Sequence, residues 1–168
     1  MFSIPLNPKL TPEQFDTFLE FLKRNKKYIY DVYYTSRIAP FGQDAMGDIF
    51  PAIEQGLISE NAYIIPKETG IPLSATFNNI EVPPTDANLD LFIKNFKNLY
   101  DNGIRIVTIP HTLWMLSGKF QRAYPDVLVK NTILRNTQRA NEIVKQVEAG
   151  FNYINLDRDL MRNEDFLK

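Results

Sequence analysis

Polar side chains that could take part in chemistry follow a series of short apolar segments, and each group begins where a segment ends. The groups are Ser36–Arg37, Asn78–Asn79, His111, Asn131–Thr132 with Arg135–Asn136, and Asp157–Arg158–Asp159. In a parallel sheet the carboxyl ends of the strands share one edge, where α/β sheets and β/α barrels hold their ligands. We therefore expect these groups to converge on one face of the fold.

Three of these side chains could transfer protons in catalysis. His111 is the only histidine and directly follows a predicted strand, so its imidazole is a candidate general acid or base. Asp157 and Asp159 follow the last predicted strand, where side chains alternate in direction, so one carboxylate would point inward. The alternative for His111 is a loop residue packed beside Trp114. The alternative for the aspartates is a structural ion pair with Arg158.

Other polar residues at this edge are candidates for substrate binding. The guanidinium of Arg158 could hold a carboxylate or a phosphate through paired hydrogen bonds. The further candidates follow the earlier strands and are Arg37, Gln43, Asp44, Asn78, Asn131 and Arg135. Their structural alternatives are bracing of the long loop after the first strand, a turn after the second, and hydrogen bonds that support the helix after the fourth.

The composition limits the chemistry that this segment can perform. It contains no cysteine, which excludes thiolate catalysis and cysteine-ligated zinc or iron–sulfur sites within the 168 residues. No cofactor is indicated, and an iron–sulfur cluster would require cysteines in sequence further downstream. The chain has no histidine pair, no His–Glu motif and no glycine-rich phosphate loop, so we predict no metal ligand and no nucleotide site.

Charge and hydropathy suggest the kind of partner. The net charge is −1 and the basic residues are scattered, so there is no signature of nucleic-acid binding. No apolar run approaches the ~18 residues of a membrane-spanning helix, and the amino-terminal residues lack a signal-peptide core. We expect a soluble, cytoplasmic protein that acts on a small molecule or a peptide and not on a membrane.

The elements that must position these residues alternate between helix and strand. The first helix is marked by Thr11-Pro12-Glu13-Gln14, which supplies an N-cap, a proline at the first helical position and a capping-box glutamine. The strands are expected at residues 30–35, 73–77, 104–110, 127–133 and 151–156. The other helices are expected at 49–57, 86–102, 113–124 and 137–149, with an extended piece at 62–66 and with Val144 and Val147 inward on the last helix.

A joint in which a helix, a glycine and a strand follow one another occurs twice, at Gly103 and at Gly150. This repetition, with three strands starting at regular intervals, predicts an α/β fold of parallel β/α units. A complete barrel needs about 200 residues or more. We therefore expect residues 1–168 to form one domain, the amino-terminal part of a TIM-like barrel that is truncated at its C-terminal end. Its open edges favour self-association, and a self-sufficient open sheet is the alternative.

The last quarter of the chain carries a family pattern. A strand beginning Pro125-Asp-Val-Leu-Val leads to a helix opening Asn136-Thr-Gln-Arg-Ala-Asn141, then to Ala-Gly150-Phe and to a strand ending Leu156-Asp-Arg-Asp-Leu160. This resembles the collagenase-like peptidase family U-32, a β/α barrel with an Asn-bearing helix, a Gly–Phe joint and a strand ending Leu-x-Arg-Glu-Leu. Arg158 matches that pattern. Asp159 stands where the family has Glu, and Asn131-Thr132-Ile133 replaces its Ser-Thr-Gln.

The resemblance implies an enzyme that acts at the carboxyl-end face of a β/α barrel, either a hydrolase or an enzyme that modifies RNA or quinone precursors. In the wider group some members hold iron–sulfur clusters through cysteines that this segment lacks. The alternative is a binding or scaffolding barrel that has kept the fold and lost the chemistry.

Overall fold

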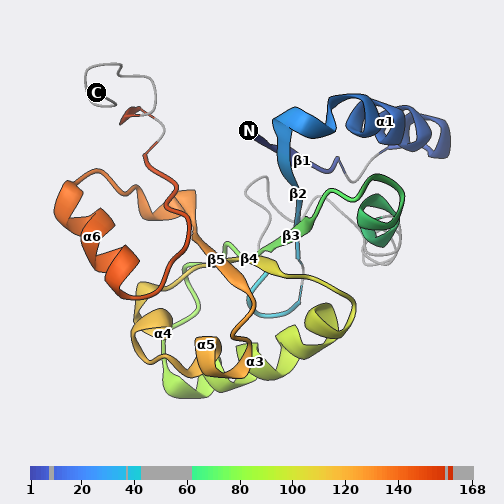
Figure 1. The fold of residues 1–168 in the computed structure, drawn as a ribbon. Coiled ribbons are helices and arrows are strands. Elements are labelled where there is room, and N and C mark those ends of the chain that lie inside the picture. Colours follow the sequence, from blue (N-terminus) through green and yellow to red (C-terminus); the bar gives the residue numbers. More distant parts are fainter. Residues whose placement is uncertain (8–9, 37, 43–61, 158, 161–168) are drawn as a thin grey trace.

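The computed structural model describes residues 1–7, 10–36, 38–42, 62–157 and 159–160. In this part, a five-stranded parallel sheet alternates with helices, which confirms the predicted α/β class (Figure 1). The strands are β1 (Phe2–Pro5), β2 (Ile29–Thr35), β3 (Leu73–Thr76), β4 (Ile106–Ile109) and β5 (Leu128–Asn131). The helices are α1 (Pro12–Asn25), α3 (Asp86–Asp101), α4 (Thr112–Leu116), α5 (Lys119–Ala123), α6 (Ala140–Glu148), the 3₁₀ turns η1 (Lys26–Tyr28) and η2 (Ile133–Arg135), and residues 62–69.

The strands lie side by side in sequence order, and each is parallel to the next. Right-handed crossovers between such neighbours place every connecting helix on the same face of the sheet. Figure 1 shows this result as an arc of helices that runs from α1 through α3 to α6. A doubly wound sheet would instead reverse its strand order and carry helices on both faces. The order seen is therefore that of consecutive parallel β/α units, and we call the face opposite the helices the inner face.

The predicted start of α1 is confirmed in detail. Thr11 Oγ1 accepts a hydrogen bond from the backbone N of Gln14 at 3.3 Å, and the Thr11 backbone N donates to Gln14 Oε1 at 3.0 Å. Both predicted glycines end their helices, because Gly103 and Gly150 have φ values of +92° and +98°. Only glycine adopts this left-handed backbone without strain. Gly103 is followed by β4, whereas no regular strand follows Gly150 in the described residues.

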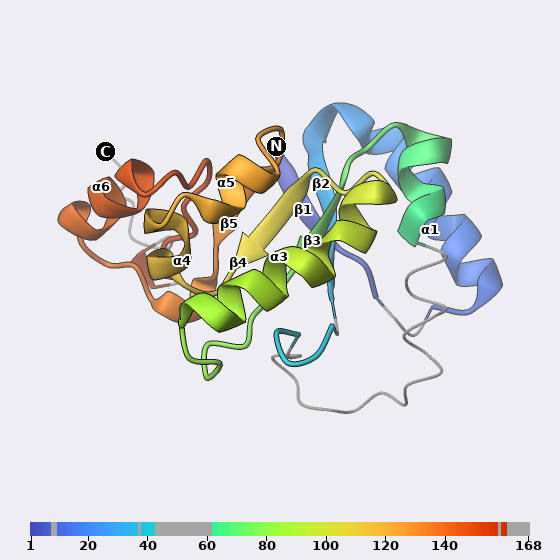
Figure 2. The same ribbon diagram turned by 90° about the horizontal axis from the view of Figure 1, so that it is seen from below.

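Aromatic side chains fill the space between the sheet and α3. Figure 2 shows α3 lying across β3 and β4. Phe92 of α3 is at the centre of this packing, with ring centroids at 4.9 Å from Phe77, 5.3 Å from Phe41 and 5.3 Å from Trp114. All four rings are at most 1% exposed. This packing fixes which side of each strand is turned toward the helices.

The structure corrects the two ends of the predicted sheet. β1 was not predicted; it pairs with β2 as an edge strand, a position that tolerates its terminal Pro5. The predicted strand at 151–156 is reduced to isolated bridges of Tyr153 with Lys130 and of Leu156 with Thr137. The physical reason is that side-chain amides replace part of the ladder: Asn152 Oδ1 accepts from the Val129 backbone N at 2.8 Å.

The predicted extended piece and two of the predicted helices also change. Residues 62–69 are helical and not extended, with Ala62, Ile65 and Thr69 buried on one helical face, and this spacing outweighs the β-propensity of the isoleucines. The helix predicted at 113–124 is divided at Gly118, whose φ is +66°, into α4 and α5. On α6, Val144 and Val147 are exposed and Gln146 faces inward.

The helix predicted at 49–57 lies outside the described residues. Among the helices that the structure describes, none is long and apolar enough to cross a membrane.

Candidate functional site

The carboxyl edge of the sheet brings together groups that the sequence singled out. Thr132, just after β5, donates its hydroxyl proton to Asn78 Oδ1, just after β3, at 2.9 Å. The Arg135 guanidinium contacts Nδ1 of His111, which follows β4. Their meeting follows from the parallel topology, and so the predicted convergence is seen for these residues.

Within this edge, His111 is a packed residue. It is 2% exposed, and its ring lies edge-on to Trp114 with centroids 4.9 Å apart. Arg135 donates to His111 Nδ1 and also, at 2.8 Å, to the carbonyl of Pro110. Burial, together with the positive charge of Arg135, holds the pKa of His111 below its usual value. These contacts fit the packed-loop alternative better than proton transfer to a substrate.

The lowered pKa of His111 predicts acid sensitivity. The unfolded chain takes up a proton as the pH falls through about 6.5, whereas the native imidazole does so only at lower pH. We expect the free energy of unfolding to fall between about pH 7 and pH 5, and to fall less in His111→Gln. Urea unfolding of both proteins at the two pH values measures this. Equal losses in the two proteins would contradict the prediction, and because His111 is the only histidine, no second imidazole confuses the comparison.

Asn131 is also occupied within the fold. Its side chain is 1% exposed, and Nδ2 donates to Gln146 Oε1 at 2.8 Å and to Thr137 Oγ1 at 3.2 Å. Asn131 Oδ1 also accepts from the backbone N of Asn155. Asn131 therefore fixes α6 and the segment after it against β5.

The predicted aspartates lie near the same edge. The Asp157 backbone N donates to the Thr137 carbonyl at 2.9 Å, and the Asp159 backbone N donates to Asp157 Oδ1 at 2.8 Å. Asn79, also at this edge, donates its side-chain amide to the Pro40 carbonyl at 2.7 Å and so braces the segment after β2. The remaining candidates lie outside the described residues: Arg37, Gln43, Asp44 and Arg158.

A second set of polar residues lines the inner face and was not predicted. Thr35, Thr76, Thr108 and Lys130 are register partners on the consecutive strands β2 to β5. Register partners on parallel strands point to the same side. Because Phe77 packs against α3, its neighbour Thr76 points away from the helices. This row, the threonine–lysine row, therefore lies on the inner face near the carboxyl ends of the strands.

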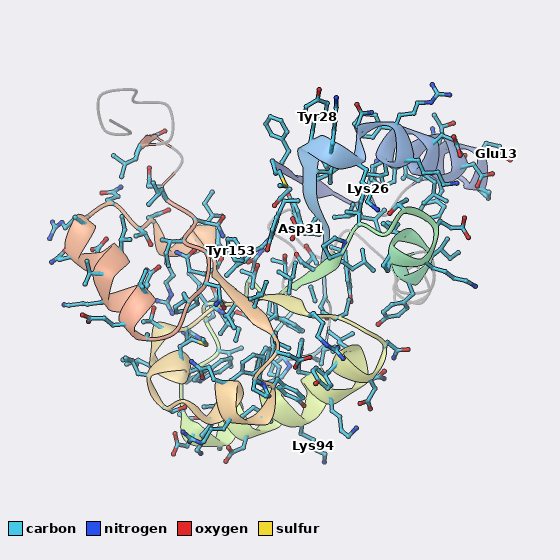
Figure 3. All side chains as sticks on the ribbon, viewed as in Figure 1. Glu13, Lys26, Tyr28, Asp31, Lys94 and Tyr153 are labelled. Atoms are coloured by element: carbon cyan, nitrogen blue, oxygen red, sulfur yellow. The ribbon has the colours of Figure 1, made fainter. Side chains whose placement is uncertain are left out.

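Lys130 forms a buried ion pair with Asp31 of β2, which lies four residues before Thr35 and so deeper on the inner face. Lys130 Nζ contacts Asp31 Oδ2 and lies 3.4 Å from Ser3 Oγ and 5.3 Å from the centre of the Tyr30 ring. Asp31 is fully buried, and the Lys130 side chain is 10% exposed. Figure 3 shows Asp31 and Tyr153 toward the centre of the molecule.

Two tyrosines complete this cluster. The hydroxyl of Tyr30 donates to that of Tyr153, and Tyr153 forms a β-bridge with Lys130. Tyr30 has no partner on β1, because the register shifts between Phe2 and Ser3. Burial and the contact with Tyr153 raise the pKa of Tyr30 well above its usual value, so its hydroxyl remains protonated at neutral pH. We call Ser3, Tyr30, Asp31, Lys130 and Tyr153 the Asp31–Lys130 cluster.

Two polar atoms on the inner face have no hydrogen-bond partner among the described residues. They are Asp31 Oδ1 and Ser74 Oγ, and both residues are fully buried. Ser74 lies two residues before Thr76 on β3, so it shares the inner face. Buried polar atoms are nearly always hydrogen-bonded. Asp31 Oδ1 can accept a hydrogen bond and the Ser74 hydroxyl can donate or accept one, so these two atoms suit the hydroxyl groups of a bound molecule.

The sequence does contain a signal for this site. Asp31 stands between Tyr30 and Val32, and Lys130 stands between Val129 and Asn131, so each is a charged residue inside an apolar strand. Opposite charges on two buried strands indicate a pair on a shared face. Asp31 and Lys130 were not predicted because the predicted site residues were those that follow the strand ends.

No group of three or more histidine, cysteine, aspartate or glutamate side chains is placed to hold a metal ion within the described residues. Neither a scan against models of protein families nor a search of curated proteins finds a match to this sequence.

Proposed function

We propose that this chain carries the active face of a β/α-barrel-type enzyme, and that a small polar substrate binds on the inner face beside Lys130 and Asp31. The observation that carries the proposal is the buried Lys130–Asp31 pair at the end of the threonine–lysine row, with Asp31 Oδ1 left without a partner among the described residues. In β/α barrels, catalytic groups stand at the carboxyl ends of the strands. Lys130 stands at that end of β5.

The energetics of the pair support a functional role. Removing both charges from water is costly, and well-packed apolar side chains of similar size would give equal or greater stability. The cost is higher here because one carboxylate oxygen of Asp31 is buried and unpaired. A protein that needs only a packed core gains little from such a pair, whereas an enzyme needs a positioned amine and carboxylate.

The family resemblance supports the same location. It begins at Pro125 and so includes β5 and Lys130. Under this proposal the substrate is a peptide or a small molecule, and the chemistry is of the hydrolase or modification type that the collagenase-like peptidases and their wider group suggest.

A second candidate is a binding or scaffolding barrel without catalysis. It is favoured by His111, Arg135 and Asn131, whose side chains form hydrogen bonds within the protein. These bonds stabilise the fold, so the three side chains at the carboxyl edge of the sheet are not available for catalysis. In that case the inner face would bind its ligand without converting it.

The test is a ligand screen with a matched pair of variants. Short peptides, hydroxyaldehydes and oxo acids are added to the protein, and the rise in melting temperature and any product are recorded. Thr108→Val removes one hydroxyl from the threonine–lysine row and is expected to weaken binding by about 2–10-fold, the worth of one hydrogen bond.

The control is Thr17→Val on the exposed surface of α1, which is expected to leave binding unchanged. Equal binding by Thr108→Val and the natural protein would place the ligand elsewhere and contradict the proposal. A ligand that depends on Thr108 and is never converted would favour the scaffolding candidate.

A further inference from the structure

We propose that Lys130 forms a covalent imine with the carbonyl carbon of a short hydroxyaldehyde, with Asp31 as the proton acceptor. This inference rests on the proposed function and names the substrate class and the reacting atom of the same site. Lysine is the side chain that forms such adducts with carbonyl substrates.

The geometry supplies the base that this reaction needs. An amine attacks a carbonyl only after it has lost a proton, and Asp31 Oδ2 is in direct contact with Lys130 Nζ. Among the described residues, the other polar contact of Nζ is Ser3 Oγ at 3.4 Å, a weak one. Lys130 is thus held by one strong partner, and that partner can accept its proton.

The step balances without any further reactant. The ammonium of Lys130 gives a proton to Asp31, and the nitrogen lone pair forms a bond to the carbonyl carbon while the π electrons move to oxygen. The oxygen then takes up the proton from Asp31 and a second one from the nitrogen and leaves as water. The product is a protonated imine, so the charge of the site is the same before and after.

A hydrogen-bond donor for the substrate oxygen is close by. The Tyr30 ring lies beside Lys130 Nζ, and its hydroxyl is bonded to that of Tyr153, which is bridged to Lys130 through the backbone. Because Tyr30 donates its proton to Tyr153, the Tyr153 hydroxyl proton is left to form a hydrogen bond to the substrate oxygen, which takes its two transferred protons from Asp31 and from the nitrogen.

The charges of the inner face select the substrate class. On β1 to β5, Asp31 and Lys130 are the charged side chains of this face, and their charges cancel. A carboxylate or phosphate on the substrate would require a further cation. The hydroxyls of the threonine–lysine row and the free atoms Asp31 Oδ1 and Ser74 Oγ instead match the hydroxyl groups of an uncharged molecule.

The experiment is reductive trapping. The full chain is incubated with glyceraldehyde and cyanoborohydride, which converts an imine into a stable secondary amine, and each lysine is then quantified by peptide mass spectrometry. We expect Lys130 to be modified at least about tenfold faster than Lys94, which is exposed on α3. A purely structural pair predicts the opposite order, because Lys130 is nearly buried. Slower labelling of Lys130 than of Lys94 overturns the inference.

Two variants assign the chemistry. Asp31→Asn is expected to slow the labelling of Lys130 by at least about tenfold and to leave that of Lys94 unchanged. Tyr153→Phe keeps the ion pair and is expected to slow it several-fold, so it provides a test if Asp31→Asn fails to fold. Unchanged rates at Lys130 in the variants that fold would overturn the assigned roles.

The outcomes also separate this inference from the proposed function. If a ligand is found whose binding depends on Thr108, but Lys130 is labelled slowly, the proposed function is supported and the inferred imine at Lys130 is contradicted. If Lys130 is labelled fast, but the ligand screen finds no ligand whose binding is weakened by Thr108→Val, the reactive amine is supported and the proposed substrate site along the threonine–lysine row is contradicted.

Discussion

Replacing Asp31 with alanine is expected to lower the free energy of unfolding by about 3–5 kcal/mol. Lys130 would remain in a nearly buried position without its anionic partner, and the cost is that of an uncompensated charge. Urea unfolding followed by circular dichroism measures the loss. The expectation holds whether or not the pair has a catalytic role, because it depends on burial alone.

The matched control is Asp101→Ala at the end of α3, where Asp101 forms an exposed pair with Lys97 at 2.6 Å. Solvent screens such pairs, so stability is expected to change very little. Replacing both buried partners, as Asp31→Leu with Lys130→Met, is expected to restore most of the stability, because neither charge is then buried. Equal effects of Asp31→Ala and Asp101→Ala would show that the inner-face pair is solvated.

The double variant has a second use, because it separates folding from chemistry. If Lys130 is a reactive amine, this protein should fold and yet show no fast labelling by glyceraldehyde. A fold that survives without the pair would also show that the charges are not needed to specify the sheet.

The local signals in the sequence predicted most of the fold correctly. The capping box at Thr11 and the apolar spacing of α3 act within a few residues, and so they can be read without knowledge of the rest of the chain. Gly103 and Gly150 are equally local, because a positive φ at the end of a helix favours glycine wherever the helix lies. Together these features determined the β/α alternation and the parallel sheet.

The site was harder to predict because it depends on how the sheet curves. Asp31 and Lys130 are 99 residues apart in sequence and lie on strands separated by β3 and β4. Alternation along each strand gives the face on which a side chain lies, but the curvature of the sheet decides whether side chains on β2 and β5 meet. The segment at 151–156 shows a similar limit, since Asn152 bonds to the backbone of β5 from a distance in sequence.

Replacing Phe92 with alanine is expected to be the second large effect, again about 3–5 kcal/mol, because it removes the central ring of the aromatic packing. The control on the same helix is Leu91→Ala, because Leu91 is 40% exposed and its removal leaves no cavity. Urea unfolding of the two variants gives the comparison. Similar losses for both would show that the space around Phe92 closes without cost.

Phe92 also connects the core to the carboxyl edge. Its ring contacts Phe41, which follows β2, and Trp114, which lies edge-on to His111. A cavity at Phe92 should therefore let Trp114 move, and the burial that lowers the pKa of His111 should weaken. We expect the pKa of His111, followed by NMR, to rise toward its usual value in Phe92→Ala and to stay unchanged in Leu91→Ala. An unchanged pKa of His111 in Phe92→Ala would instead mean that the contacts of Arg135 with His111 and with the Pro110 carbonyl hold the imidazole in place without help from the aromatic packing.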